Sequence, residues 1–157
     1  KIDVWMWADI GSFRRGDFKD RKLLQHVNAV VPDSSTVVWM AHRKPDPPDD
    51  PYWTRKLVRN EKHHFYHSGS HAIGTMSAWV TFYTHFVRVM DEYAQRGLFV
   101  GEDQCVLQST CLLYPDSCAY IPSDQVPDNR YWGLRTALYS GPGKGKMFEL
   151  WRAPAPT

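Results

Sequence analysis

One apolar run that ends in an acid constrains the fold of this chain more than any other feature. Residues 4–8 read Val-Trp-Met-Trp-Ala, Asp9 follows at once, and Gly11 lies two positions further on. A continuous apolar run of this length is typical of a strand buried on both faces. In open α/β sheets, ligands bind at the carboxyl ends of the strands. We therefore expect a buried strand over residues 2–9 that presents Asp9 at such an edge; the alternative is that Asp9 caps a helix or forms a loop salt bridge.

Further segments predict an alternation of strands and helices. Thr36 to Ala41 is rich in β-branched residues and predicts a strand, and Gly97 is expected just after the end of a long helix over 77–96. The apolar face of that helix comprises Trp79, Phe82, Tyr83, Phe86, Val89, Met90 and Tyr93. The other expected elements are a helix over 22–30, an extended segment over 63–73, a helix from about residue 102 to Pro115, and a strand over 119–121. The alternation predicts an α/β fold with a mostly parallel sheet.

The length of the chain fits a single domain. A chain of 157 residues can bury one sizeable core. Because the chain has no initiating Met and enters a strand almost at once, we expect residues 1–157 to be the C-terminal portion of a larger domain. Residues 44–52 hold four prolines among several aspartates, and this Pro/Asp loop is expected to be exposed.

Charge and cysteine content exclude several classes of protein. A net charge of +2 with interspersed acids predicts no nucleic-acid partner, and no apolar run is long enough for a membrane segment. The three cysteines form no CxxC pair. Cys111 and Cys118 flank a helix end and a turn, where a disulfide is plausible, and Cys105 is expected to be buried. The aromatic content of 14% suits either a well-packed core or stacking against sugars.

Two clusters of polar residues are candidates for chemistry. Glu102, Asp103 and Gln104 open a predicted helix, where the helix dipole alone would favour the acids. Four histidines lie within nine residues, at 63, 64, 67 and 71. In an extended chain, three of them would share one face but spread over about 26 Å, at about 3.3 Å per residue. That spacing disfavours a single zinc site.

Four blocks in order give the chain a resemblance to a known family. They are residues 7–14 (Trp-Ala-Asp-Ile-Gly-Ser-Phe-Arg), 68–74 (Ser-Gly-Ser-His-Ala-Ile-Gly), 101–104 (Gly-Glu-Asp-Gln) and 115–116 (Pro-Asp). In these blocks the chain resembles glycosyltransferases of the GT-A type, in particular the HtrL/YibB-like group. The resemblance covers roughly residues 2–121. It implies a three-layer α/β/α domain that transfers a sugar from a nucleotide-sugar donor to a hydroxyl of a carbohydrate or glycoconjugate acceptor.

The resemblance also implies roles for individual residues. Asp103 would be the catalytic residue, binding sugar hydroxyls or acting as a base. Asp9 would contact the donor ribose or a Mn²⁺ or Mg²⁺ ion. The remaining donor- or acceptor-binding positions would be Gly11, Gly69, Ser70, Gln104, Gly141 and Lys144.

The chain departs from the family pattern at two places. Gly11 stands where a DxD motif has its second acid, and Leu138 stands where some relatives have the histidine of a diphosphate-binding tail loop. Gly141 and Lys144 match that tail loop in spacing only and could equally belong to a surface loop. A non-catalytic GT-A-like module that binds a carbohydrate or a nucleotide is therefore the alternative.

Overall fold

The computed structural model describes residues 3–9, 25–31, 35–41, 57, 67–100, 103–126, 133–142 and 147–152. The predicted 44–52 loop lies outside these residues. The elements are β1 (Val4–Ala8), α1 (Val27–Val30), β2 (Val37–Ala41), β3 (His67–Thr75), α2 (Met76–Gln95), α3 (Asp103–Leu113), β4 (Cys118–Pro122) and α4 (Gly133–Ser140), with short 3-10 turns η4 (Pro115–Ser117) and η5 (Ser123–Gln125).

The four strands form one mixed sheet in the order β1-β3-β2-β4. Strand β3 is antiparallel to both β1 and β2, whereas β2 and β4 are parallel. The expectation of a mostly parallel sheet is therefore wrong for the described strands, because two of their three pairings are antiparallel. Strands β2 and β3 follow each other in sequence with no predicted helix between them, and such strands can pair antiparallel without a crossover.

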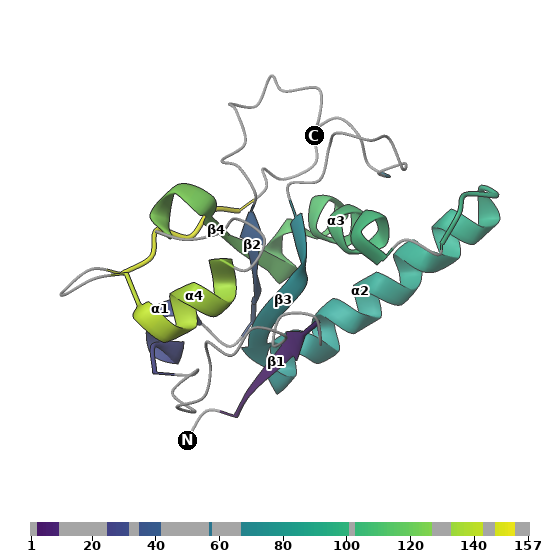
Figure 1. The fold of residues 1–157 in the computed structure, drawn as a ribbon. Helices are drawn as coiled ribbons and strands as arrows, with labels where there is room; N and C mark the ends of the chain where they lie inside the picture. The colour runs from purple at the N-terminus through teal and green to yellow at the C-terminus, as the bar shows by residue number, and fades with distance from the viewer. Residues whose placement is uncertain are drawn as a thin grey trace.

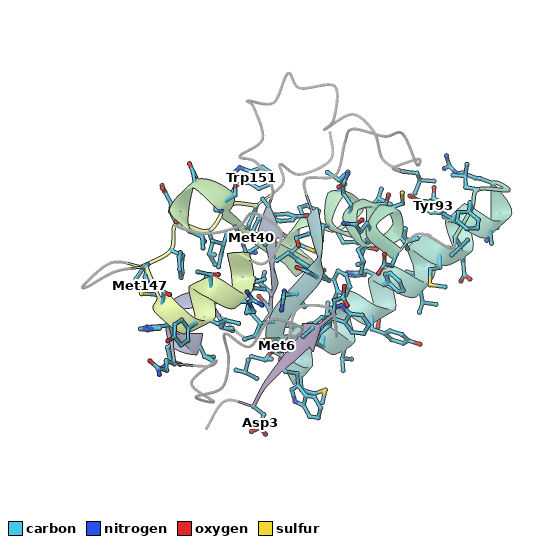
Figure 2. The ribbon with its side chains drawn as sticks, viewed as in Figure 1. Asp3, Met6, Met40, Tyr93, Met147 and Trp151 are labelled. Carbon is cyan, nitrogen blue, oxygen red and sulfur yellow. A yellow bond between two sulfur atoms is a disulfide. The ribbon has the colours of Figure 1, made fainter. Side chains whose placement is uncertain are left out.

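Helices cover both faces of the sheet (Figure 1). On one face, α2 and α3 pack around Trp39, Ala72 and Phe82. On the other face, α1 and α4 pack around Val38, Met40, Ile73 and neighbouring residues. Met40 is fully buried there and contacts the start of α4 (Figure 2). The predicted α/β class is confirmed, and the GT-A fold itself stays a prediction.

Strand β1 lies at one end of the described sheet and is only half buried. Met6 and Val4 pack against the core on the α4 face. Trp5 and Trp7 point to the opposite face and are 55% and 54% exposed. The prediction of a strand here is confirmed, but the prediction that it is buried on both faces is wrong. Alternate residues of this apolar run therefore face two different surfaces, the core on the α4 side and a solvent-exposed surface on the other side.

Helix α2, Met76–Gln95, lies within one residue at each end of the predicted helix over 77–96. The side-chain oxygen of Thr75 accepts a hydrogen bond from the amide of Ala78 at 3.1 Å and caps the helix. Gly97 has a φ of +64°, as expected of the residue after a helix end. On the predicted apolar face, Phe82 is buried but Tyr83 is 65% exposed, so the inclusion of Tyr83 in the core face is wrong.

The cysteine expectations agree with the structure. Cys111 at the end of α3 and Cys118 at the start of β4 form a disulfide. Cys105 on α3 is buried and is not part of a disulfide. The bond joins α3 to the parallel β2–β4 pair and so fixes the helix that begins at Asp103 against the sheet. Within the described part of the chain, no helix is both long and apolar enough to span a membrane.

Candidate functional site

The first half of β3 departs from regular pairing and contacts the start of α3. Its register against β2 shifts between Trp39 and Ala41, which indicates a bulge in the strand. A Cβ atom added to Gly69 would lie 2.9 Å from Cγ of Gln104. Glycine at this position therefore allows the Gln104 side chain to lie directly on the strand.

The start of α3 places a carboxylate beside this contact. Asp103 is the first residue of the helix, and its Oδ1 accepts a hydrogen bond from the amide of Gln104 at 2.8 Å. The side chain of Asp103 is exposed. The amino end of a helix carries partial positive charge, which is a favourable place for an acidic side chain.

Asp9 lies across from the same part of β3. The amide of Asp9 donates a hydrogen bond to the carbonyl of Ser70 at 2.8 Å, so the β1–β3 ladder extends one residue beyond β1. The end of β1 is thus next to the strand segment that contacts α3. The structure brings together five of the residues singled out in the sequence: Asp9, Gly69, Ser70, Asp103 and Gln104.

Gly141, another predicted site residue, lies at the end of α4. Gly141 follows α4 with a φ of +65°, and its amide donates to the carbonyl of Ala137 at 2.9 Å. A Cβ atom at Gly141 would lie 2.6 Å from Nδ1 of His26. These features explain a glycine there as a helix-terminating residue. Gly11 and Lys144 lie outside the described residues.

A chain of buried polar side chains runs through the β3 bulge. The hydroxyl oxygens of Ser68 and Ser70 are 2.7 Å apart, and Oγ of Ser70 is 3.0 Å from Nδ1 of His71. All three residues are buried. Ser68 was not a predicted site residue, and His71 entered only through a motif and a histidine cluster. The signal that could have found both is their unusual polarity within a strand.

The charge state of His71 follows from its surroundings. The pKa of His71 is lowered to about 4, chiefly by burial and then by the nearby Arg135 guanidinium, while the Asp9 carboxylate opposes both. Arg135 is itself largely buried on α4. His71 is therefore neutral at pH 7 and can exchange a hydrogen bond with Ser70 without adding charge beside Asp9.

We expect this neutral histidine to make folding stability depend on pH. Its pKa is about 4 when folded and 6.5 in the reference state, so unfolding takes up a proton between these values. The free energy of unfolding is therefore highest above pH 6.5 and declines as pH falls toward 4, by about 3 kcal/mol in total. Urea unfolding at intervals from pH 4 to 7.5 measures this slope.

The comparison variants for this pH series are His71→Gln and His85→Gln. His71→Gln should remove most of the slope in this window. His85 has a pKa lowered by burial and then by Arg88, but its ring is only part-buried, so His85→Gln should remove less. An unchanged slope in His71→Gln would mean that another group controls the pH dependence.

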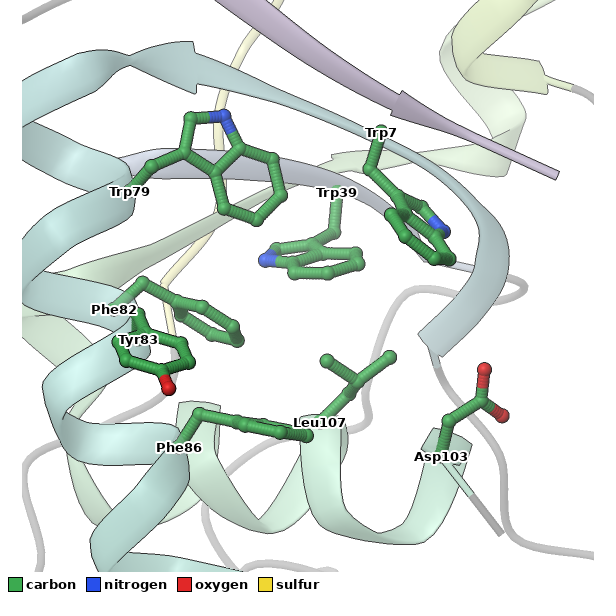
Figure 3. A pocket seen from close by; sticks show the side chains of 8 residues that line it. All are labelled: Trp7, Trp39, Trp79, Phe82, Tyr83, Phe86, Asp103 and Leu107. Carbon is green, nitrogen blue, oxygen red and sulfur yellow. The ribbon is translucent and has the colours of Figure 1, made fainter.

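A cavity of about 300 Å³ opens beside Asp103 (Figure 3). Its walls are apolar apart from one carboxylate, and Figure 3 shows rings from β1, β2 and α2 facing a common space. Among the described residues that line it, Asp103 is the charged one. The lining residues are Trp7, Trp39, Trp79, Phe82, Tyr83, Phe86, Asp103 and Leu107.

The cavity also contacts the β3 bulge through Trp7. The indole N–H of Trp7 donates to the carbonyl of Gly69 at 3.4 Å. Trp39 packs edge-on to Trp79, with ring centroids 6.1 Å apart. Asp9 is not among the lining residues, although Trp7 precedes it by two positions. The sequence left two roles open for the aromatic residues, packing in the core and stacking against sugars. In the structure Phe82 and Trp39 are buried in the core, whereas Trp7 is half exposed.

No cluster of three or more His, Cys, Asp or Glu side chains suited to a metal occurs among the described residues. His63 and His64 of the histidine cluster lie outside them. Comparison of the chain with family models, with curated proteins and with solved structures finds no significant match.

Proposed function

We propose that this chain carries the reaction centre of a glycosyltransferase that moves a sugar from a nucleotide-sugar donor to a hydroxyl acceptor. The observation that supports this most is an aromatic cavity lined by the carboxylate of Asp103 and by Trp7, whose indole N–H donates to the carbonyl of Gly69. An aromatic ring can stack against the apolar C–H face of a sugar, and a carboxylate can accept its hydroxyl protons. Concave sites of this kind, apolar with a few placed polar groups, are typical of small-molecule binding.

The proposed chemistry assigns one step to Asp103. Its carboxylate accepts the proton of the acceptor hydroxyl as that oxygen bonds to the anomeric carbon of the donor sugar. The bond from that carbon to the diphosphate oxygen breaks, and its electron pair leaves with the diphosphate. This step describes an inverting enzyme; in a retaining one, Asp103 would hold sugar hydroxyls instead.

Asp9 is proposed to face the diphosphate side of the donor. Among the described residues, no group of three or more metal-ligating side chains includes Asp9. A Mn²⁺ or Mg²⁺ ion would therefore take Asp9 as one ligand and obtain most others from donor phosphate oxygens and water, as Mg²⁺ often does. The ion would supply charge neutralisation at the leaving diphosphate.

Calorimetric titration tests the donor side of the proposal. We expect Mn²⁺ to bind weakly alone and more tightly with a nucleoside diphosphate such as UDP or GDP. Asp9→Asn should weaken the diphosphate-dependent binding at least tenfold, whereas the exposed Asp124→Asn on η5 should leave it unchanged. Equal Mn²⁺ affinity with and without diphosphate, or wild-type binding by Asp9→Asn, would remove Asp9 from the site.

A second candidate function is a carbohydrate-binding module that does not catalyse transfer. The observation that favours it is the nearly uniform aromatic lining of the cavity, with a single acid at its margin. Such a module would bind glycans in the cavity but would neither bind nucleoside diphosphates nor release them from nucleotide-sugars. Incubation with UDP- and GDP-sugars in the presence of glycans, followed by mass spectrometry, separates the two functions.

A further inference from the structure

A second cavity adjoins the one beside Asp103. It has a volume of about 210 Å³ and is lined by Trp5, Met6, Trp7, Met76 and Trp79. Trp7 and Trp79 line both cavities. The two spaces therefore form adjacent parts of one surface between β1 and the first turns of α2, and the larger one ends at Asp103.

Two tryptophans of this surface, Trp7 and Trp79, have hydrogen-bonded indole N–H groups. The indole N–H of Trp79 donates to the backbone carbonyl of Trp5 at 3.0 Å, and that of Trp7 donates to Gly69. Trp5 and Trp7 are two positions apart on β1, so they leave the same face of the strand about 7 Å apart. Side chains whose orientation is already fixed lose little entropy when a ligand binds.

We propose that this surface binds the acceptor as an extended neutral oligosaccharide, with its reacting end at Asp103 and further sugar units over Trp7 and Trp5. This inference rests on the proposed function and specifies its acceptor. The described lining residues of the second cavity are all uncharged, which favours a neutral ligand. A pyranose ring presents a flat apolar face with polar hydroxyls at its edge, so it can cover an exposed indole without burying unpaired polar groups.

A lipid and an apolar peptide are the alternative ligands for this surface. A lipid or an apolar peptide would also cover the exposed Trp5 and Trp7. Neither would explain why the apolar surface leads to a carboxylate at the amino end of α3. The oligosaccharide explains both ends of the surface, because its reducing or non-reducing terminus is polar and its ring faces are not.

The test is calorimetric titration of the protein with neutral cello-oligosaccharides and manno-oligosaccharides of one to six units. We expect affinity to rise with length over the first four units. Trp5→Ala should reduce the affinity for the longer ligands roughly tenfold, the amount that corresponds to about 1.4 kcal/mol. It should leave the affinity for the disaccharide within twofold. The Trp79 hydrogen bond survives this substitution because its acceptor is the backbone carbonyl of residue 5.

Phe99→Ala is the matched control, since Phe99 is an exposed aromatic outside both cavities. It should bind every ligand like the wild type. Affinity that does not depend on length, or an equal effect of both variants, would overturn the extended acceptor. Binding of phosphatidylcholine vesicles that Trp5→Ala abolishes would overturn it in favour of a lipid.

Failure of the proposed function gives a different result. Length-dependent, Trp5-dependent binding without sugar transfer from any nucleotide-sugar would retain this surface and support the binding module. Transfer to monosaccharides as efficient as to longer acceptors would retain the transferase and overturn the extended acceptor.

Discussion

Asp103→Asn is expected to lower the rate of sugar transfer by about 10²–10⁴-fold, the range typical of the loss of a general base. The proposed role requires a group that accepts a proton, and an amide cannot. The substitution keeps the shape of the side chain and an oxygen at the position that accepts the Gln104 amide hydrogen bond. The start of α3 should therefore remain intact. Single-turnover measurement of transfer with a saturating donor isolates the chemical step.

Asp116→Asn serves as the control for this variant. Asp116 is also an exposed acid near the start of a short helical element, in η4, but it is not among the lining residues of either cavity. The transfer rate of Asp116→Asn should equal that of the wild type. The free energies of unfolding of both variants should lie within about 1 kcal/mol of the wild-type value. A rate for Asp103→Asn within threefold of the wild type would remove Asp103 from catalysis, whatever the outcome for glycan binding.

Phe82→Ala is expected to lower the free energy of unfolding by about 3 kcal/mol, the lower end of the range for a buried phenylalanine. Phe82 is 3% exposed and lies between Trp39 and Trp79, with ring centroids 5.4 and 5.9 Å away. The loss should fall at the lower end because the ring also borders the cavity, so the space that it leaves can admit water. Urea unfolding followed by far-UV circular dichroism measures the change.

Tyr83→Ala is the control for Phe82→Ala, one position along the same helix. Because Tyr83 is 65% exposed, its removal should change the free energy of unfolding by less than about 0.5 kcal/mol. Similar losses for the two variants would show that the inner face of α2 is assigned incorrectly. The pair also tests a point at which sequence periodicity was misleading, since both residues fit the predicted apolar face.

Local sequence signals predicted the elements that are determined by neighbouring residues. Gly97 was predicted just after the end of α2, because a left-handed glycine acts within one helical turn; the Thr75 cap at its start was not predicted. The start of α3 near Asp103 and the disulfide between Cys111 and Cys118 could be predicted for the same reason, because both depend on residues close in sequence. The helix over Gly133–Ser140 was not predicted, because a glycine at its start and only two turns of length give weak periodicity.

The sequence by itself thus determined the α/β class, the limits of α2 and the identity of the acids at Asp9 and Asp103. It could not determine strand order, since insertion of β3 between β1 and β2 depends on pairing over more than twenty-five positions in sequence. Only that insertion places Ser70 opposite Asp9 and Gly69 beneath Gln104. The exposure of one face of β1 could not be predicted either, because an apolar run does not show which of its faces a helix will cover. Trp7 became part of a cavity wall, and not of the core, because α2 covers that face only in part.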